Sequence, residues 1–202
     1  MQQIMDQAMQ QNKNILILAS ARSGSHALAS SLRCLYPDIQ YLKEICRAET
    51  NSHPWLEIAS MFAVNPMKLA HITQARSKIF LVQTASDIKR SCVTVELRRR
   101  DKVRQFGSWV YFRHLGAQYN FDHKGANYVD PGSITVDMQD IEQFLVEQII
   151  DMCFDADFVV YYEDLDLTTS LVQPNQYAYP IEQCIKNLDL VQTYLRNWQY
   201  LE

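Results

Sequence analysis

The first stretch that could do chemistry runs from Ile15 to Leu32 and reads ILILASARSGSHALASSL. A short apolar run leads into a loop of small residues with one arginine, Arg22, and then into a segment of helical spacing. Successive backbone N–H groups at the start of a helix favour a bound anion by roughly 0.3–1 kcal/mol. Gly24 permits close backbone approach, and Ser23 and Ser25 add hydroxyl donors. The residues alone leave two interpretations open, a phosphate-binding loop or an ordinary tight turn.

This loop lacks the pattern of an ATP- or GTP-binding loop. That pattern, G-x-x-x-x-G-K-[ST], has a first glycine and a lysine after the second glycine. Here the first glycine is missing, and Arg22 precedes Gly24 where a lysine would follow it. Because no acidic Mg²⁺ site is evident either, a nucleotide kinase is disfavoured.

A second stretch, LRRRDKVRQFGSW at residues 97–109, concentrates positive charge. Its arginines follow the end of an expected strand, and Arg100, Arg104 and Ser108 recur at four-residue intervals. If the segment is helical, this spacing places the three residues roughly along one face. Arginine can bind a terminal phosphate in a bidentate manner. The alternatives are a solvated basic helix start or a patch for nucleic acid or acidic partners.

Apolar runs and amphipathic segments alternate around these two stretches. Continuous or β-branched apolar runs predict strands, and apolar residues three or four apart predict helices. The expected strands are 14–20, 39–42, 78–83, 92–98 and 158–162. The expected helices are 25–35, 53–64, 101–115, a segment marked by Ile141 to Met152, and a tail marked by Ile185 to Trp198; 119–133 has the composition of a loop.

This alternation predicts one α/β domain over residues 1–202, with three α/β/α layers and a mostly parallel central sheet. Residues 1–13, polar and rich in glutamine, are expected to be flexible. In such sheets ligands bind at the carboxyl ends of strands. The loops after Ala19, Leu42, Gln83 and Leu97 are therefore the places where a site is expected.

The composition limits the function classes. The formal net charge of −4 argues against general nucleic-acid binding, so any basic patch must be local. The five cysteines are scattered without a C-x-x-C pair, which fits neither a zinc site nor a disulfide framework and favours buried thiols in a reducing compartment. The sequence shows no signal peptide and no membrane span, so we expect a cytoplasmic protein.

The two stretches together resemble the sulfotransferases, which use 3′-phosphoadenosine 5′-phosphosulfate (PAPS) as sulfuryl donor. RSGS followed by a small-residue helix resembles the family's loop P-R-S-G-S-T-L-L, with Ala21 in place of proline and His26 in place of threonine. RRDKVRQFGSW is similar to the corresponding segment of bacterial trehalose 2-sulfotransferase-type enzymes, in which an arginine and a serine eight residues later hold the 3′-phosphate. Arg100 and Ser108 have that spacing, and Arg99 is the alternative arginine for binding this phosphate.

The resemblance implies a P-loop NTPase-like fold, PAPS as co-substrate and no metal. It implies that the 5′-phosphosulfate is held by the loop residues Arg22, Ser23, Gly24, Ser25 and His26. Arg22 would also neutralise charge on the leaving oxygen. The acceptor would be a small-molecule or glycan hydroxyl, on a carbohydrate or a lipid-linked group, with no nucleic acid involved. The short segment between Glu44 and Lys78 implies an open pocket, a large acceptor or a partner subunit, which leaves a homodimer open.

The proton acceptor is the least defined part of the expected site. QYLKEIC resembles the family segment whose glutamate is the base, which points to Glu44, although a surface glutamate fits the same residues. His53 is the alternative base, or else it lies near the cap of a helix. Lys78 and Gln83 match a family segment beside the acceptor, but an edge lysine and a strand-end polar residue explain them equally well. Tyr162 lies in YEDL, a match that implies a role in ordering the loop rather than in chemistry.

The main alternative is a catalytically inactive nucleotide-binding or interaction protein on the same fold. The replacement of threonine by His26 and the short acceptor region favour it.

Overall fold

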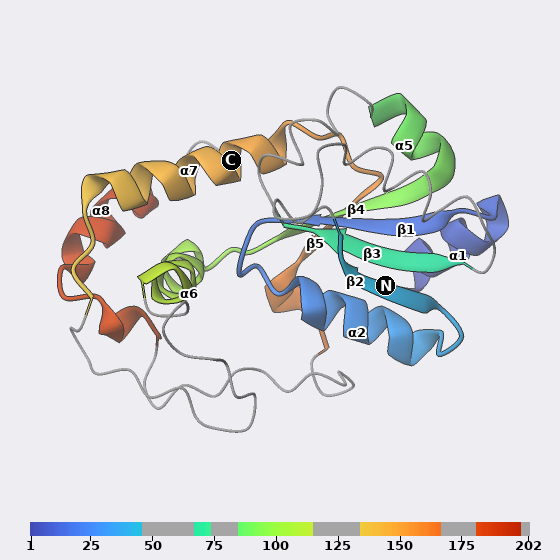
Figure 1. The fold of residues 1–202 in the computed structure, drawn as a ribbon, viewed down its shortest axis with the longest axis horizontal. Helices are drawn as coiled ribbons and strands as arrows, with labels where there is room; N and C mark the ends of the chain where they lie inside the picture. The colour runs from blue at the N-terminus through green and yellow to red at the C-terminus, as the bar shows by residue number, and fades with distance from the viewer. Residues whose placement is uncertain (46–66, 74–84, 115–133, 167–180, 199–202) are drawn as a thin grey trace. The chain divides into compact units, whose positions relative to one another are not determined.

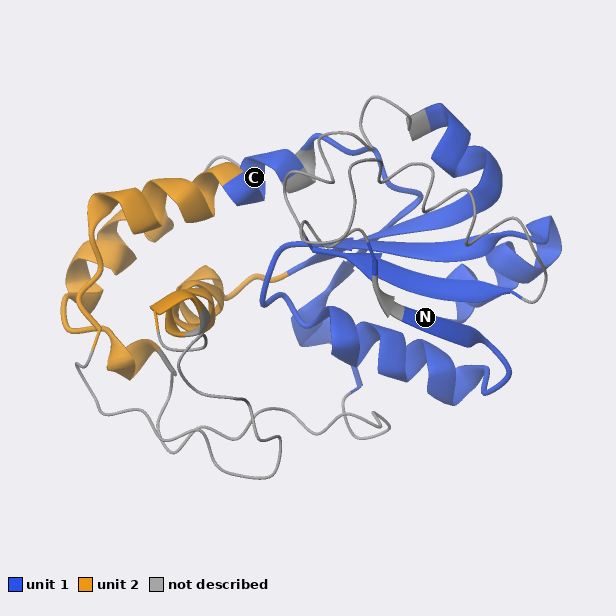
Figure 2. Ribbon diagram, viewed as in Figure 1, with its two compact units in different colours: residues 1–98, 147–173 blue, residues 99–146, 174–202 orange. Residues whose placement is uncertain are grey.

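The structure, a computed structural model, describes residues 1–45, 67–73, 85–114, 134–166 and 181–198 (Figure 1). The strands are β1 (Asn14–Ala19), β2 (Gln40–Glu44), β3 (Lys68–Ile72), β4 (Cys92–Arg98) and β5 (Phe158–Tyr161). The helices are α1 (Gln2–Gln11), α2 (Ser25–Leu35), α5 (Ala85–Ser91), α6 (Lys102–His114), α7 (Met138–Met152) and α8 (Leu188–Trp198), with short 3₁₀ helices η1 (Tyr162–Asp164) and η3 (Ile181–Cys184). The chain divides into two compact units, unit 1 with residues 1–98 and 147–173 and unit 2 with residues 99–146 and 174–202 (Figure 2).

Unit 1 is built on a five-stranded parallel sheet in the order β2-β3-β1-β4-β5. The central strand β1 pairs with β3 on one side and with β4 on the other, where Ala19 lies opposite Leu97. A central strand of a parallel sheet is covered on both faces, which explains its uninterrupted apolar sequence. The expected α/β class with a parallel central sheet is thereby confirmed.

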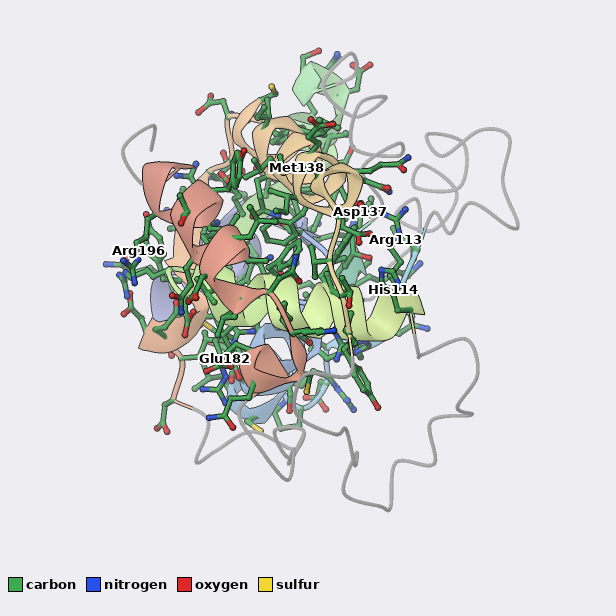
Figure 3. All side chains as sticks on the ribbon, turned by 90° about the vertical axis from the view of Figure 1, so that its left-hand side faces the viewer. Arg113, His114, Asp137, Met138, Glu182 and Arg196 are labelled. Carbon is green, nitrogen blue, oxygen red and sulfur yellow. The ribbon has the colours of Figure 1, made fainter. Side chains whose placement is uncertain are left out.

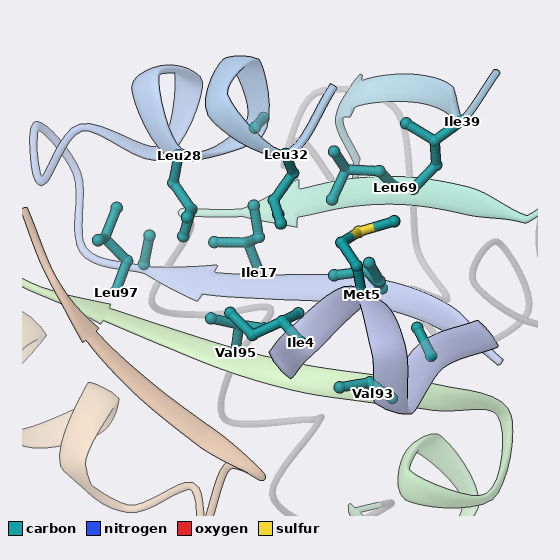
Figure 4. Packing of buried hydrophobic residues seen from close by; sticks show 14 of the residues in the cluster. Ile4, Met5, Ile17, Leu28, Leu32, Ile39, Leu69, Val93, Val95 and Leu97 are labelled. Atoms are coloured by element: carbon teal, nitrogen blue, oxygen red, sulfur yellow. The ribbon is translucent and has the colours of Figure 1, made fainter. Parts of the chain in front are cut away.

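One face of the sheet packs against helices α1 and α2. Leu28 and Leu32 of α2 and Ile4 and Met5 of α1 lie in one buried cluster with the strand residue Ile17 (Figure 4). Residues 1–13 were expected to be flexible, and the structure differs, because Gln2–Gln11 forms α1 with Ile4, Met5 and Ala8 buried. The glutamine-rich composition conceals an apolar stripe of one helix face.

The opposite face of the sheet packs against α5 and the chain after α7. Leu16 and Leu18 of β1 share a buried cluster there with Ile88 and Phe154. The side chains of successive strand residues point to opposite faces, so β1 supplies both clusters. Unit 1 is therefore a three-layer α/β/α arrangement, as expected.

Unit 2 has its own core around α6. Phe106 and Trp109 of α6 pack in ring contacts with Phe144 of α7. Beside them, His114 contacts the buried carboxylate of Asp140 at 3.2 Å, with Arg113 also close to it; His114 and Arg113 are labelled in Figure 3. These contacts fix α6 within its unit.

Most expected elements agree with the structure within a few residues, but β3 was missed. Its sequence KLAHI is short and polar at two of five positions, so it carries no clear strand pattern. The expected helix 53–64, strand 78–83 and loop 119–133 lie outside the described residues. Among the helices that the structure describes, none is long and apolar enough to span a membrane.

Candidate functional site at the carboxyl end of the sheet

The loop between β1 and α2 is a tight turn closed by its own serines. The Ser23 N–H donates to the Ser20 carbonyl at 3.2 Å, and the Ser23 hydroxyl donates to the same oxygen at 2.7 Å. The backbone φ angle is 65° at Arg22 and 97° at Gly24, both in the left-handed region. A residue with a side chain rarely adopts this conformation, so at Arg22 the hydrogen-bonded turn imposes it. The Ser23 hydroxyl, expected to donate to an anion, instead donates within the loop.

Gly24 lies against the ring of Tyr162. A Cβ atom added at Gly24 would come within 2.2 Å of the Tyr162 ring. Sequence reasoning explained this glycine by close approach of a ligand, whereas here the Tyr162 ring occupies the space over its Cα atom. Tyr162 follows β5, so the interpretation that it orders the loop agrees with this contact.

A polar cluster that the sequence did not reveal joins the start of α2 to strands β2 and β3. The hydroxyl of Tyr41 lies 3.2 Å from Nδ1 of His26 and 2.9 Å from Nδ1 of His71. The two imidazole rings are in edge contact, with centroids 4.6 Å apart. His26 is exposed, whereas His71 is completely buried. No spacing in the sequence could have indicated this cluster, because its members come from three separate elements.

Glu44 lies at the end of β2, as expected. Its main chain pairs with His71 of β3, and the Ile45 N–H donates to the His71 carbonyl at 3.0 Å. Because β3 stands between β2 and β1, Glu44 is two strand spacings, about 10 Å, from β1. The sequence did not predict β3, the strand that separates β2 from β1.

The end of β4 carries a buried ion pair that sequence reasoning also missed. Nε of Arg98 donates to Oε1 of Glu96 at 2.7 Å, and its terminal nitrogen donates to Oε2 at 3.0 Å. The Glu96 side chain is only 3% exposed and that of Arg98 is 25% exposed. The hydrogen bonds to Glu96 raise the pKa of Arg98 above its ordinary value. Arg98, the first arginine of the basic stretch, is thus bound to a carboxylate of the protein itself.

The rest of the basic stretch belongs to unit 2. Asp101 caps α6 by accepting the Arg104 N–H at 2.8 Å. Arg100 precedes the helix, so the four-residue helical spacing applies only to Arg104 and Ser108. Arg100 and Arg104 are exposed, Arg99 is half-buried and Ser108 is buried.

Three expected acceptor-side residues, His53, Lys78 and Gln83, lie outside the described residues. Within the parts of the chain that the structure describes, no group of three or more His, Cys, Asp or Glu could hold a metal ion.

The fold and the loop define an α/β protein with a candidate anion site at the carboxyl end of β1. No known protein-family model matches this chain, and no curated protein matches it. Among solved structures, a fungal RNA kinase is similar over 94% of this chain and 89% of its own, with 11% identical residues and a TM-score of 0.36. A likeness at this level carries no argument about function.

Proposed function

We propose that the protein is a sulfotransferase that moves a sulfuryl group from PAPS to a hydroxyl acceptor. The observation that carries this proposal is the parallel pairing of β1 with β4, in which Ala19 lies opposite Leu97. Arg22 and Arg100 are each the third residue after this pair. Within unit 1, the loop after β1 and the end of β4 therefore lie at the edge where parallel sheets bind ligands.

The proposed roles follow the chemistry of sulfuryl transfer, which resembles phosphoryl transfer. Such reactions depend mainly on positioning and on neutralising charge around an in-line displacement. Arg22, Ser25 and His26 would bind the phosphosulfate, with Ser23 and Gly24 shaping their loop. Arg100, or its neighbour Arg99, and Ser108 would bind the 3′-phosphate, an assignment that rests on their sequence spacing. Glu44 is the base that the sequence favours.

A second candidate is a nucleotide-binding protein without transfer activity. Two observations favour it: the Ser23 hydroxyl donates to Ser20 within the loop, and the Tyr162 ring covers Gly24. Both groups are thereby committed to the protein rather than to a ligand.

Calorimetry tests the nucleotide assignment without any acceptor. The probe is 3′-phosphoadenosine 5′-phosphate, and AMP is the matched control because it lacks only the 3′-phosphate. We expect the bisphosphate to bind at least tenfold more tightly than AMP or ATP, since hydrogen bonds to charged groups contribute about 1.5–3 kcal/mol. Equal affinity for AMP would contradict the 3′-phosphate assignment.

Activity is tested by transfer of labelled sulfate from PAPS to sugar, lipid and phenol acceptors. Labelled product with any class supports a sulfotransferase. Selective binding of the bisphosphate without transfer to any acceptor would favour the inactive nucleotide-binding protein.

A further inference from the structure

The ion pair of Glu96 and Arg98 lies at the same end of the sheet as the loop between β1 and α2. Leu97 pairs with Ala19, so Arg98 and Ser20 each follow directly after this pair on neighbouring strands. Neighbouring strands are about 4.8 Å apart, which is less than the length of an arginine side chain. Of the three consecutive arginines in the basic stretch, Arg98 is the one that lies in the same unit as the loop.

Arg98 and α2 approach this end of the sheet from opposite faces. Leu97 shares a buried cluster with Leu28 and Leu32 of α2, and successive strand residues point to opposite faces. The side chain of Arg98 therefore lies on the other face, where Cys92 of the same strand is buried. An anion at the edge between the two faces would meet the loop on one side and Arg98 on the other.

The contacts with Glu96 fix the orientation of the Arg98 guanidinium. Glu96 precedes Arg98 by two residues on the same face of β4, and it accepts hydrogen bonds from Nε and from Nη2. A guanidinium is planar, and its Nη1 lies on the side of the central carbon opposite the edge that carries Nε and Nη2. Nη1 of Arg98 therefore points away from Glu96, towards the carboxyl end of β4.

Arg98 has donors left for a ligand. Its guanidinium carries five N–H groups, and two of them are donated to Glu96. Tyr161 of β5, opposite Arg98 in the strand ladder, also interacts with it. Within the described part of the chain, Glu96 and Tyr161 are the hydrogen-bond partners of Arg98. The Arg98 side chain is 25% exposed, so its remaining N–H groups are accessible to a ligand from solvent.

Stability alone is a weak reason for this buried pair, since replacing both partners of such a pair by apolar residues is often neutral. A pair that fixes an arginine beside a binding edge has a different benefit. The guanidinium is held in one orientation before the ligand arrives, so binding costs little side-chain entropy.

We infer that Arg98 binds the sulfuryl group of the donor, across the edge from the loop that binds the 5′-phosphate, and that Glu96 is the positioning residue that orients its guanidinium. This inference rests on the proposed function. A phosphosulfate carries two anionic groups joined by one bridging oxygen, so it matches two binding elements that approach from opposite faces. A sulfuryl oxygen accepts a charge-assisted hydrogen bond from the Nη1–H group of Arg98.

Two nucleotides that lack the 3′-phosphate test this assignment by calorimetry. Adenosine 5′-phosphosulfate has the sulfuryl group and AMP does not, so the ratio of their affinities reports contacts with that group. The double variant Glu96→Gln, Arg98→Gln replaces the ion pair by two neutral amides and leaves no buried charge without a partner. We expect it to bind adenosine 5′-phosphosulfate about 10–100-fold more weakly than the wild type, since hydrogen bonds to charged groups are strong. Its affinity for AMP should equal that of the wild type.

Single variants keep the test valid if urea denaturation shows that the double variant does not fold. Arg98→Lys keeps the charge but lacks the planar fork, so it should also lose affinity for adenosine 5′-phosphosulfate and not for AMP. Glu96→Gln should lower the affinity ratio less, because its amide oxygen still accepts a hydrogen bond from Arg98. Arg90→Gln, at an exposed arginine of α5 that pairs with Asp87, is the matched control and should leave both affinities unchanged.

The outcomes separate this inference from the proposed function. If the wild type prefers 3′-phosphoadenosine 5′-phosphate to AMP, and the Arg98 variants keep the wild-type affinity ratio, the inference is wrong and the proposed function stands. An equal loss of affinity for both test nucleotides would also overturn the inference, because the sulfuryl group would then not be what Arg98 binds. Selective loss of adenosine 5′-phosphosulfate, in a protein that does not prefer the 3′-phosphorylated nucleotide, would support the role of Arg98 and contradict the 3′-phosphate assignment. A wild-type protein that binds none of the three nucleotides would overturn both.

Discussion

The ends of the neighbouring strands β1 and β4 are held in different ways. After β1, the loop Ser20–Gly24 is fixed by its own hydrogen bonds, by two left-handed residues and by the Tyr162 ring. After β4, the chain has one arginine in a buried ion pair and then exposes Arg100 and Arg104. The loop should therefore respond to substitution mainly through stability, and the exposed arginines mainly through binding.

The largest effect is expected from Gly24→Ala. The new Cβ would meet the Tyr162 ring, and the φ of 97° disfavours any side chain. Left-handed strain and overpacking together should lower the free energy of unfolding by about 2–4 kcal/mol. Urea denaturation measures this change, and the double variant Gly24→Ala, Tyr162→Ala is the control. If Gly24→Ala lowers the unfolding free energy as much in the Tyr162→Ala background as in the wild type, contact with the Tyr162 ring is not the reason for glycine at this position.

The next effect concerns Arg98, the arginine that the ion pair engages. Arg98→Ala would leave the Glu96 carboxylate buried without its bidentate partner. We expect a loss of about 2–3 kcal/mol of unfolding free energy, at or just below the range for buried pairs because Arg98 itself is partly exposed. Arg104→Ala, at an exposed position, is the control and should cost less than about 0.5 kcal/mol.

The same ion pair allows a sharper test. Adding Glu96→Leu to Arg98→Ala removes the buried carboxylate that Arg98 no longer neutralises. The double variant should recover part of the lost unfolding free energy, since apolar replacements of buried pairs are often neutral. No recovery would mean that the cost of Arg98→Ala comes from lost packing rather than from the carboxylate.

Arg100→Ala tests the other side of the comparison. Because Arg100 is exposed and precedes α6, the unfolding free energy should change by less than about 0.5 kcal/mol. Affinity for 3′-phosphoadenosine 5′-phosphate should fall by about 10–100-fold, with the AMP affinity unchanged. Arg99→Ala and Arg104→Ala are the matched variants for calorimetry. If Arg99→Ala weakens binding of the bisphosphate more than Arg100→Ala does, Arg99 holds the 3′-phosphate. If all three variants bind the bisphosphate as tightly as the wild type, none of the three arginines holds it.

Local patterns were enough to predict β1, α2, β4 and α6, because each is encoded by adjacent residues. The strand β3 was missed because KLAHI is short and places a buried histidine inside the sheet. Strand order depends on pairing between distant segments, which no local pattern contains.

The candidate site was predictable only in part, for the same reason. The loop and its arginine are contiguous, so their pattern is visible in the sequence. Gly24 is needed because the ring of Tyr162, far along the chain, lies against it. In the His26 cluster, Tyr41 lies 15 positions from His26 and 30 positions from His71. Tertiary packing therefore turned Ser23 and Gly24 from expected ligand contacts into parts of the loop's own structure.

The smallest effect, on stability at alkaline pH, comes from Cys92 of the sheet. Burial raises the pKa of this thiol from 9.0 to about 12. Between these values the unfolded chain binds fewer protons than the native protein, so stability falls as the pH rises. The loss at pH 10 should be about 1.4 kcal/mol relative to pH 8. Urea denaturation under reducing conditions should show this difference between wild type and Cys92→Ala, whereas Cys153→Ala, at an exposed thiol, should keep the wild-type dependence. A Cys92→Ala protein that loses the same stability over this pH range would show that the thiol is ionised, or accessible, in the folded sheet.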